Sequence, residues 1–326
     1  MSELKTRLSE FFGIQHPILS APMALAAGGR LASSVTKAGG LGFIGGAYGD
    51  GNWMEDQYQE AGNTPVGIGF ITWHLEQALK QFPNLLDDAL AKQPSALFLS
   101  FGDPEPHTKK IEAAGVPLIC QVQTLPDAER ALGCDAKVIV AQGCEAGGHG
   151  LNRATMTLVP EVADLISRNN ADAILCAAGG IADGRGLAAS LMLGAEGVLV
   201  GSRLWASEEA LVHPKMLEAA IKATGDDTIR SSVMDIARHL KWPPEYTARV
   251  LKNGFTKRWH NDIEGLLANA DEQASLWKEA WASGDTAIAN TFVGEASGLI
   301  DSILPAEKLI KSMVKEAEER LALFNN

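Results

Sequence analysis

Short apolar runs rich in β-branched residues recur between residues 17 and 200, and each is followed by a stretch with the pattern of a helix. The runs are apolar throughout, which is typical of parallel strands covered on both faces. Eight strands that alternate with helices every roughly 20–35 residues predict an α/β fold, a (β/α)₈ TIM barrel, better than an open sheet. The predicted strands are Pro17–Ala21, Leu41–Ile44, Val66–Phe70, Ala96–Phe101, Pro117–Val122, Lys137–Ala141, Ala173–Ala177 and Gly197–Val200.

The alternation stops after the eighth strand. From about His213 to Thr291 the pattern is helical, and this stretch carries four of the seven tryptophans. A long helix is then predicted over Pro305–Phe324, because its apolar residues recur on one face. We therefore predict a barrel formed by residues 1–212 and 292–326, with residues 213–291 inserted as a helical cap domain over the active site. An elaborated eighth helix of the barrel is the alternative.

The composition favours a well-packed fold with an acidic surface. The chain has 326 residues, of which 46% are hydrophobic and 21% charged, so a substantial core is expected. The formal net charge of −12 argues against nucleic acid or an anionic membrane as a main partner, because both need a basic surface. A local positive site for one phosphate remains compatible with this charge.

The cysteines and the amino-terminal segment bear on the compartment. Cys120, Cys134, Cys144 and Cys176 form no CxxC pair, so neither a disulfide framework nor a zinc site is expected. The segment MSELKTRLSEFFG carries charges and lacks the apolar core of a signal peptide, and no apolar run approaches the ~20 residues of a membrane span. We expect a soluble, cytoplasmic protein.

Glycine-rich segments follow the last two predicted strands. The seventh leads into AGGIADGRG at Ala178–Gly186, and the eighth into Gly201, Ser202 and Arg203. In a barrel both open side by side on the carboxyl-terminal face, where barrel enzymes bind phosphate and glycine lets backbone N–H groups approach an anion. Neither matches GxGxxG, and the acidic residue of a dinucleotide site is missing. Each alone is typical of a tight turn, but the pair indicates a phosphorylated ligand.

The sixth predicted strand ends in a third glycine-rich segment, AQGCEAGGHG at Ala141–Gly150, from which His149 projects. Its small residues would let the backbone lie against a flat ligand, and a histidine with a pKa near ~6.5 can act as a general base near neutral pH. The alternative is a histidine that serves only the turn. His74 and His107 follow the third and fourth strands and could also line the site. No histidine pair has metal-ligand spacing, so no metal is expected.

Five segments, in their order along the chain, resemble segments of the nitronate monooxygenase family, whose members were formerly called 2-nitropropane dioxygenases. The resemblance covers nearly the whole chain. It is less specific for one reaction, because flavin-dependent enoyl-acyl-carrier-protein reductases and NADH:quinone reductases share the same segments. Besides AQGCEAGGHG, the matching segments are PILSAPM at Pro17–Met23, AGGLG at Ala38–Gly42, AAGGIADGRGLAASLMLGAEGVLVGSRL at Ala177–Leu204 and GEASGLI at Gly294–Ile300.

The resemblance implies an FMN cofactor, a small helical domain over the flavin, and His149 as the catalytic residue. The end of the first strand would line the flavin ring, the sixth loop would contact it, and the last two loops would hold the phosphate. Gly69 stands where many bacterial members have an asparagine, so that side-chain contact is missing. The implied cofactor-binding residues are Ala21, Pro22, Met23, Gly69, Gln121, Gln142, Gly147, Gly148, Gly179, Gly180, Leu199, Val200, Gly201 and Ser202.

Three functions are open on this evidence. The first is an FMN-dependent nitronate monooxygenase that oxidises alkyl nitronates or nitroalkanes with O₂ to carbonyl compounds and nitrite, in a dry pocket to which Trp73 and the cap tryptophans contribute. The alternative is an NAD(P)H-dependent FMN reductase of quinones or enoyl thioesters. A barrel that binds a phosphorylated ligand without catalysis is a third. Small molecules are the expected partners, without nucleic acid or membrane, and a homodimer is compatible with the sequence.

Overall fold

The computed structural model describes residues 4–323, and its centre is a parallel sheet that has eight strands within that part of the chain. The strands lie in the order β1-β9-β8-β6-β5-β4-β3-β2. From β2 to β9 each strand pairs with the next in sequence once the short β7 is left aside, and β1 pairs with the last strand, β9. Their bounds are β1 Ile18–Ser20, β2 Phe43–Ala47, β3 Gly67–Ile71, β4 Leu97–Ser100, β5 Leu118–Val122, β6 Val138–Gln142, β8 Ile174–Ala178 and β9 Gly197–Val200.

The two end strands of this sheet, β1 and β2, meet and make the barrel nearly closed. Leu19 and Leu41 form an isolated parallel bridge, and the Ser20 N–H donates to the Leu41 carbonyl at 3.0 Å. The Phe43 N–H then donates to the Ser20 hydroxyl at 2.9 Å, so a side chain replaces a ladder bond. The predicted α/β barrel with its eight strands is confirmed, with small shifts at the strand ends.

Alternate strand residues divide the core into two layers, as the two-residue period of a strand requires. Inside the barrel the rings of Phe43 and Phe98 pack edge to face with centroids 5.7 Å apart, and Leu8 of α1 (Arg7–Phe12) closes the amino-terminal end. Residues such as Ile18 point outward and pack against the helices. Each fully buried large apolar side chain contributes about 1.5–3 kcal/mol.

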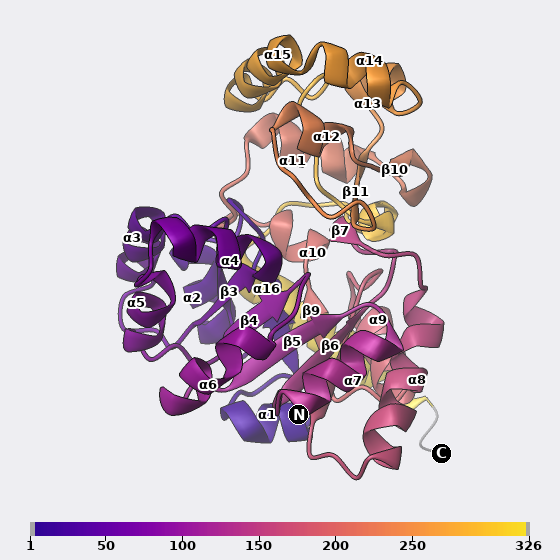
Figure 1. Ribbon diagram of the computed structural model, residues 1–326. Coiled ribbons are helices and arrows are strands. Elements are labelled where there is room, and N and C mark those ends of the chain that lie inside the picture. The colour runs from indigo at the N-terminus through magenta and orange to yellow at the C-terminus, as the bar shows by residue number, and fades with distance from the viewer. Residues whose placement is uncertain (1–3, 324–326) are drawn as a thin grey trace.

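Helices surround the strands, as Figure 1 shows. The long carboxyl-terminal helix packs on α9 and on α2, and so joins the end of the chain to its beginning. It runs over Ala306–Ala322, close to the predicted Pro305–Phe324; Phe324 lies outside the described residues. The helices around the barrel are α2 Gly29–Lys37, α3 Gly51–Ala61, α4 Thr72–Gln81, α5 Leu85–Ala91, α6 Glu105–Ala113, α7 Leu125–Gly133, α8 Thr155–Arg168, α9 Gly184–Met192, the short α10 Ser202–Trp205 and α16 Ala306–Ala322.

The segment predicted to be helical from His213 to Thr291 lies beyond one end of the barrel in Figure 1, and for two stretches the prediction is wrong. β10 (Thr228–Ser231) and β11 (Thr247–Leu251) are strands, and with β7 (Gly148–Gly150) they form a second, antiparallel sheet in the order β10-β11-β7. These strands are short and each carries an arginine, the half-buried Arg230 in β10 and the buried Arg249 in β11, so they lack the apolar runs of the barrel strands. The helices of this segment are α11 Pro214–Lys222, α12 Val233–Ala237, α13 Gly254–Trp259, α14 Ile263–Ala268 and α15 Ala270–Ser283.

Candidate functional site

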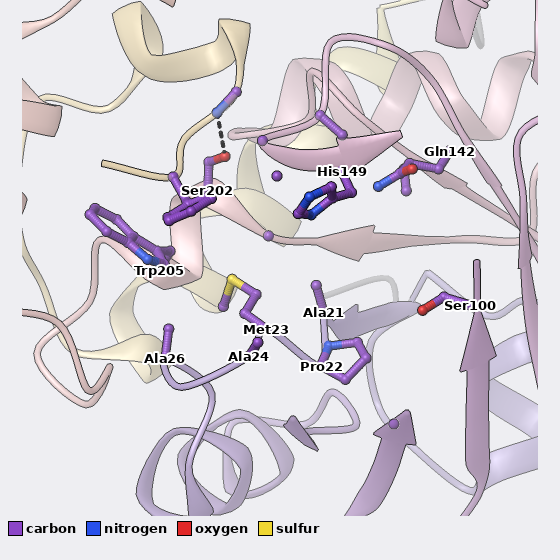
Figure 2. A pocket seen from close by; sticks show the side chains of 18 of the residues that line it. Ala21, Pro22, Met23, Ala24, Ala26, Ser100, Gln142, His149, Ser202 and Trp205 are labelled. Atoms are coloured by element: carbon purple, nitrogen blue, oxygen red, sulfur yellow. Dashed lines mark hydrogen bonds between the residues drawn. The ribbon is translucent and has the colours of Figure 1, made fainter. Parts of the chain in front are cut away.

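A cavity of about 250 Å³ lies where the carboxyl ends of the barrel strands meet the second sheet. Its walls are mostly apolar or glycine, with a few polar groups that converge on it, which is the usual character of a ligand pocket. Figure 2 shows His149 between Ser202 and Gln142, with Ala21 and Pro22 near it. The predicted site residues that line the cavity are Ala21, Pro22, Met23, Gly69, Gln121, Gln142, Gly147, Gly148, His149, Gly179, Gly180, Leu199, Gly201 and Ser202.

Val200 is the predicted residue that does not line this cavity. Strand alternation turns the Leu199 side chain toward the barrel interior and the Val200 side chain into the outer core layer, where it is fully buried. The Val200 carbonyl accepts a hydrogen bond from the Ala21 N–H at 3.0 Å. Its predicted contact to a cofactor stays a prediction, and the side chain is not available for it.

The loop after β8 has the backbone geometry that a cradle for an anion needs. Gly179 and Gly180 have φ of +102° and +73°, a region that favours glycine. A Cβ at Gly179 would lie 2.9 Å from the Gly143 carbonyl oxygen, so the loop can pass its neighbour only without a side chain. Asp183 caps α9 by accepting hydrogen bonds from the Arg185 and Gly186 N–H groups. These N–H groups at the start of α9 therefore already have acceptors. The backbone of the glycines before α9 is what a ligand could bind.

The loop after β9 lies beside the first one at the cavity. A Cβ at Gly201 would stand 3.7 Å from the Ala21 Cβ, so the end of β1 borders this loop closely. The Ser202 hydroxyl accepts a hydrogen bond from the Gly294 N–H at 2.9 Å, the dashed line in Figure 2. This bond uses an acceptor lone pair and leaves the hydroxyl hydrogen free to donate.

Gln121 and Gln142 line the cavity at the ends of β5 and β6, and Gln123 lies just after β5. The Gln123 side-chain amide donates to the Gln142 Oε1 at 2.9 Å, and both residues are buried. The Gln121 Nε2 is buried and has no hydrogen-bond partner within residues 4–323. A buried donor of this kind needs an acceptor, and the ring nitrogens and carbonyl oxygens of a flavin would supply one. The residues present therefore fit a flavin, and the two glycine loops would be the part of the cavity able to hold its phosphate.

At Gly69, where the sequence predicts no side-chain contact to a cofactor, the fold leaves no room for a side chain. A Cβ at Gly69 would lie 2.5 Å from the Pro22 ring, which is closer than such contacts occur. β3 and the segment after β1 thus pack directly against each other at this point. The missing side chain is a consequence of that close approach, and both residues line the cavity.

His149 lies on β7, opposite Ala248 of β11, and only 9% of the residue is exposed. Its Nε2 lies 2.9 Å from the Asp235 Oδ2, and Asp235 is also buried. The Trp242 ring stacks on the imidazole with centroids 3.4 Å apart and an interplanar angle of 6°, and Phe101 lies edge-on to it. The imidazole is thus held by its hydrogen bond to Asp235 and by stacking on the Trp242 ring.

Burial lowers the pKa of His149, and the hydrogen bond and charge of Asp235 oppose this by favouring the imidazolium. Arg238 and Arg230 lower the pKa further by charge repulsion. The balance leaves His149 with a pKa below its ordinary value, so the ring is neutral at pH 7. A neutral imidazole is the form that accepts a proton.

Two arginines of the second sheet fix the loop that carries His149. Arg230 donates to the carbonyls of Cys144, Gly150 and Thr247, and burial lowers its pKa to about 10. Arg249 donates from Nε to the same Cys144 carbonyl at 3.0 Å and pairs with Glu295 at 2.8 Å. The loop is therefore held by two arginines that face each other across the β10–β11 pair.

His74, His107 and Trp73, which the sequence predicts near the site, do not line the cavity. His107 is buried in α6, and His74 packs edge-on against Tyr48. Trp73 lies behind Trp242, with ring centroids 5.2 Å apart. They follow strand ends as expected, but the first turns of their helices point them into packing contacts. Sequence reasoning missed Asp235, Arg238 and Phe101, although the tryptophans of residues 213–291 pointed to that segment.

Neither a metal cluster nor a membrane span emerges from residues 4–323. The described histidine, cysteine and carboxylate side chains nowhere form a group of three that could hold a metal ion. In the same part of the chain, no helix combines the length and the apolar character needed to cross a bilayer.

The glycine loops and the buried histidine thus gather around one cavity at the carboxyl ends of the barrel strands, which is where barrel enzymes have their active sites. The sequence profile described as nitronate monooxygenase matches residues 5–71 and 70–316. A nitronate monooxygenase of Neurospora crassa is 33% identical, over 97% of this chain and 93% of that protein. The chain belongs to the nitronate monooxygenase family.

Solved structures are similar to this chain over nearly its whole length. The structure of FabK from Thermotoga maritima is similar with a TM-score of 0.85 and 29% identity, over 98% of this chain and 98% of that one. The nitroalkane oxidase from Streptomyces ansochromogenes has a TM-score of 0.77 at 23% identity, over 97% of this chain and 99% of that one. At this lower identity the likeness is one of fold.

Proposed function

We propose that this protein is an FMN-dependent nitronate monooxygenase that oxidises alkyl nitronates or nitroalkanes with O₂ to carbonyl compounds and nitrite. The observation that carries the proposal is the placement of His149, a neutral buried base over a cavity with the features of a flavin site. Membership of the nitronate monooxygenase family supports the choice of reaction.

FMN would be held by groups that already converge on the cavity. Gly179, Gly180, Gly201 and Ser202 would surround the phosphate with backbone N–H groups and one hydroxyl. The ring would lie against the end of β1 and Gly147, with Gln121 donating to one of its acceptors. When bound, FMN supplies the redox chemistry of the reaction.

The polypeptide would supply proton transfer and a dry setting. His149 would remove the α-proton of a neutral nitroalkane and so convert it to the nitronate. Trp242 and Phe101 would keep water from that side of the imidazole. We propose residues 213–291 as the cap that closes this cavity, set on a barrel of residues 1–212 and 292–326.

The variant His149→Asn tests the base directly. Its turnover of neutral nitroalkanes should fall by roughly 10²–10⁴-fold, as expected when a general base is lost. Turnover of preformed nitronates should fall far less, because they have no α-proton to remove, and the variant should keep its FMN. Nitrite release from both substrates, measured on the same preparation, gives the ratio of nitroalkane turnover to nitronate turnover.

The matched control is His239→Asn. His239 is an exposed histidine of residues 213–291 with a φ of +53°, a conformation that asparagine adopts readily. It should retain both activities. Near wild-type turnover of neutral nitroalkanes by His149→Asn would remove His149 from the mechanism.

An NAD(P)H-dependent FMN reductase of quinones or enoyl thioesters is the second candidate. It is tested alongside because flavin-dependent enoyl-acyl-carrier-protein reductases and NADH:quinone reductases resemble the same segments of this chain. A reductase would bleach the flavin with NADH in the absence of oxygen, whereas a nitronate monooxygenase would respond to nitronate. A colourless protein that binds no flavin would instead favour a non-catalytic barrel.

A further inference from the structure

We propose that Asp235 is a positioning residue that fixes the tautomer of His149 and leaves Nδ1 as the atom that takes the substrate proton. The proposal rests on the proposed function of the site and extends it to a residue 86 positions away in the sequence. Its basis is the 2.9 Å contact between the His149 Nε2 and the Asp235 Oδ2, with both side chains less than one tenth exposed.

The contact fixes which ring nitrogen carries the hydrogen. A carboxylate only accepts hydrogen bonds, so Nε2 is the protonated nitrogen of the neutral ring and donates to Asp235. Nδ1 then carries the lone pair, and it makes no hydrogen bond within residues 4–323. When Nδ1 takes a proton, the charge of the imidazolium is balanced by the adjacent carboxylate.

The surroundings of Asp235 suit this role better than a role in folding. Its Oδ1 is buried without a hydrogen-bond partner among the described residues, so His149 is the principal partner of the side chain. A carboxylate buried with so little compensation costs stability, and an apolar residue at this place would not. Asp235 lies in the middle of α12, where the neighbouring Val233 and Met234 are fully buried and hold the helix in place.

Trp242 completes the support of the imidazole. Its ring covers one face of His149, and its Nε1 donates to the Tyr48 hydroxyl at 3.3 Å. Rotation of the imidazole about its side-chain bonds would break this stacking and the bond to Asp235 together. The ring is thus held in one orientation before any substrate enters.

The charges around His149 make the carboxylate important for the pKa as well. Arg238 at the end of α12 and Arg230 of β10 disfavour the imidazolium, and Asp235 is the group that favours it. Arg249 of β11 is paired with Glu295, and Tyr48, beyond Trp242, has a raised pKa because it is buried. Removal of the Asp235 charge should lower the pKa of His149 further, so the acid limb of activity should move to lower pH.

The test compares Asp235→Asn with the wild-type holoenzyme. With neutral nitroalkanes, kcat should fall by roughly 10–100-fold, part of the ~10²–10⁴-fold that a general base supplies. With preformed nitronates it should change by no more than about 3-fold, because that reaction does not need the base. The acid limb of the kcat profile should move to lower pH. A purely structural role would lower both activities together and leave the limb in place.

Asp262→Asn is the matched control, since Asp262 caps α14 with an exposed side chain paired to Arg258, away from the cavity. It should retain both activities and the pH profile. Equal losses on both substrates with an unmoved acid limb in Asp235→Asn would overturn the proposal. Failure of the wild-type protein to turn over nitronate would instead overturn the proposed function, so the two failures are distinguishable.

A measurement on the wild-type holoenzyme covers the case in which Asp235→Asn does not fold. Nitrogen-15 NMR of labelled histidines reports which ring nitrogen is protonated, and the His149 signals are assigned by their loss in His149→Asn. At a pH where the ring is neutral, the expected result is a protonated Nε2 and a bare Nδ1. A protonated Nδ1 would overturn the proposal.

Discussion

Arg238 brings a positive charge to the edge of the cavity among aromatic rings. Its guanidinium carbon lies 5.4 Å from the centres of the Tyr48 and Trp277 rings and 5.9 Å from that of Phe292. Within residues 4–323 it forms no salt bridge with a carboxylate, although it lines the cavity. A half-buried cation without an acidic partner is suited to an anionic ligand, and a nitronate is an anion.

Arg238→Met should therefore weaken the binding of nitronates more than the binding of neutral nitroalkanes. We expect KM for nitronates to rise by about 10-fold or more, equivalent to one lost charge-assisted contact of about 1.5–3 kcal/mol, while KM for neutral nitroalkanes changes little. Steady-state kinetics on both substrates checks this. Arg258→Met is the control, because Arg258 also lies over an aromatic ring, at 4.1 Å from that of Trp259, but not at the cavity. If Arg238→Met raised KM equally for both substrates, Arg238 would act through packing alone.

Residues that follow strand ends were predictable from the sequence, whereas their partners were not. Gly179 and Gly201 were recognised because a barrel places the ends of consecutive strands side by side. His149 was recognised through its glycine-rich segment. Asp235 reaches His149 only through the pairing of β7 with β11, and no local pattern around it indicates that contact. Its hydrogen bond is a product of the tertiary fold.

At the level of elements, the loop after β8 depends on a backbone conformation with positive φ, which glycine adopts far more easily than other residues. Gly179→Ala would place a Cβ 2.9 Å from the Gly143 carbonyl oxygen, on a residue whose φ is +102°. Neither the backbone oxygen nor this φ can change at little cost in free energy. Strain of about 1–3 kcal/mol in this loop should raise the FMN dissociation constant by roughly 10-fold. Flavin fluorescence during titration of the apoprotein measures that constant.

Gly133→Ala serves as the control for this loop. Gly133 lies at the end of α7, without a positive φ, and a Cβ there would meet nothing within 4 Å. This variant should bind FMN as the wild type does. If Gly179→Ala bound FMN with unchanged affinity, the phosphate would have to lie elsewhere.

Long apolar strands were predictable, and the short strands of the second sheet were not. β10 reads TIRS and β11 reads TARVL, each with an arginine that donates hydrogen bonds to backbone carbonyls. β7 is a glycine-histidine-glycine segment that becomes a strand only because β11 pairs with it. Propensity and periodicity carry no information about such pairing, so the sequence predicts helix or loop for these segments.

Across the whole molecule, the second sheet connects the predicted cap to the catalytic loop. β7 leaves the barrel after β6 and pairs with β11, as Figure 1 shows at the junction between the two parts. The position of His149 over the cavity therefore depends on both parts being folded together. The barrel was predictable from the rhythm of its strands, whereas this connection was not. A homodimer stays a prediction.

The flavin spectrum of the purified holoenzyme, followed with two reductants, decides most directly whether this is a nitronate monooxygenase built around His149. Nitronate should reduce the flavin without oxygen, and with oxygen it should give nitrite and a carbonyl compound in continuous turnover. NADH should leave the flavin oxidised over the same period. Rapid bleaching by NADH with quinone turnover, and no response to nitronate, would contradict the proposed function.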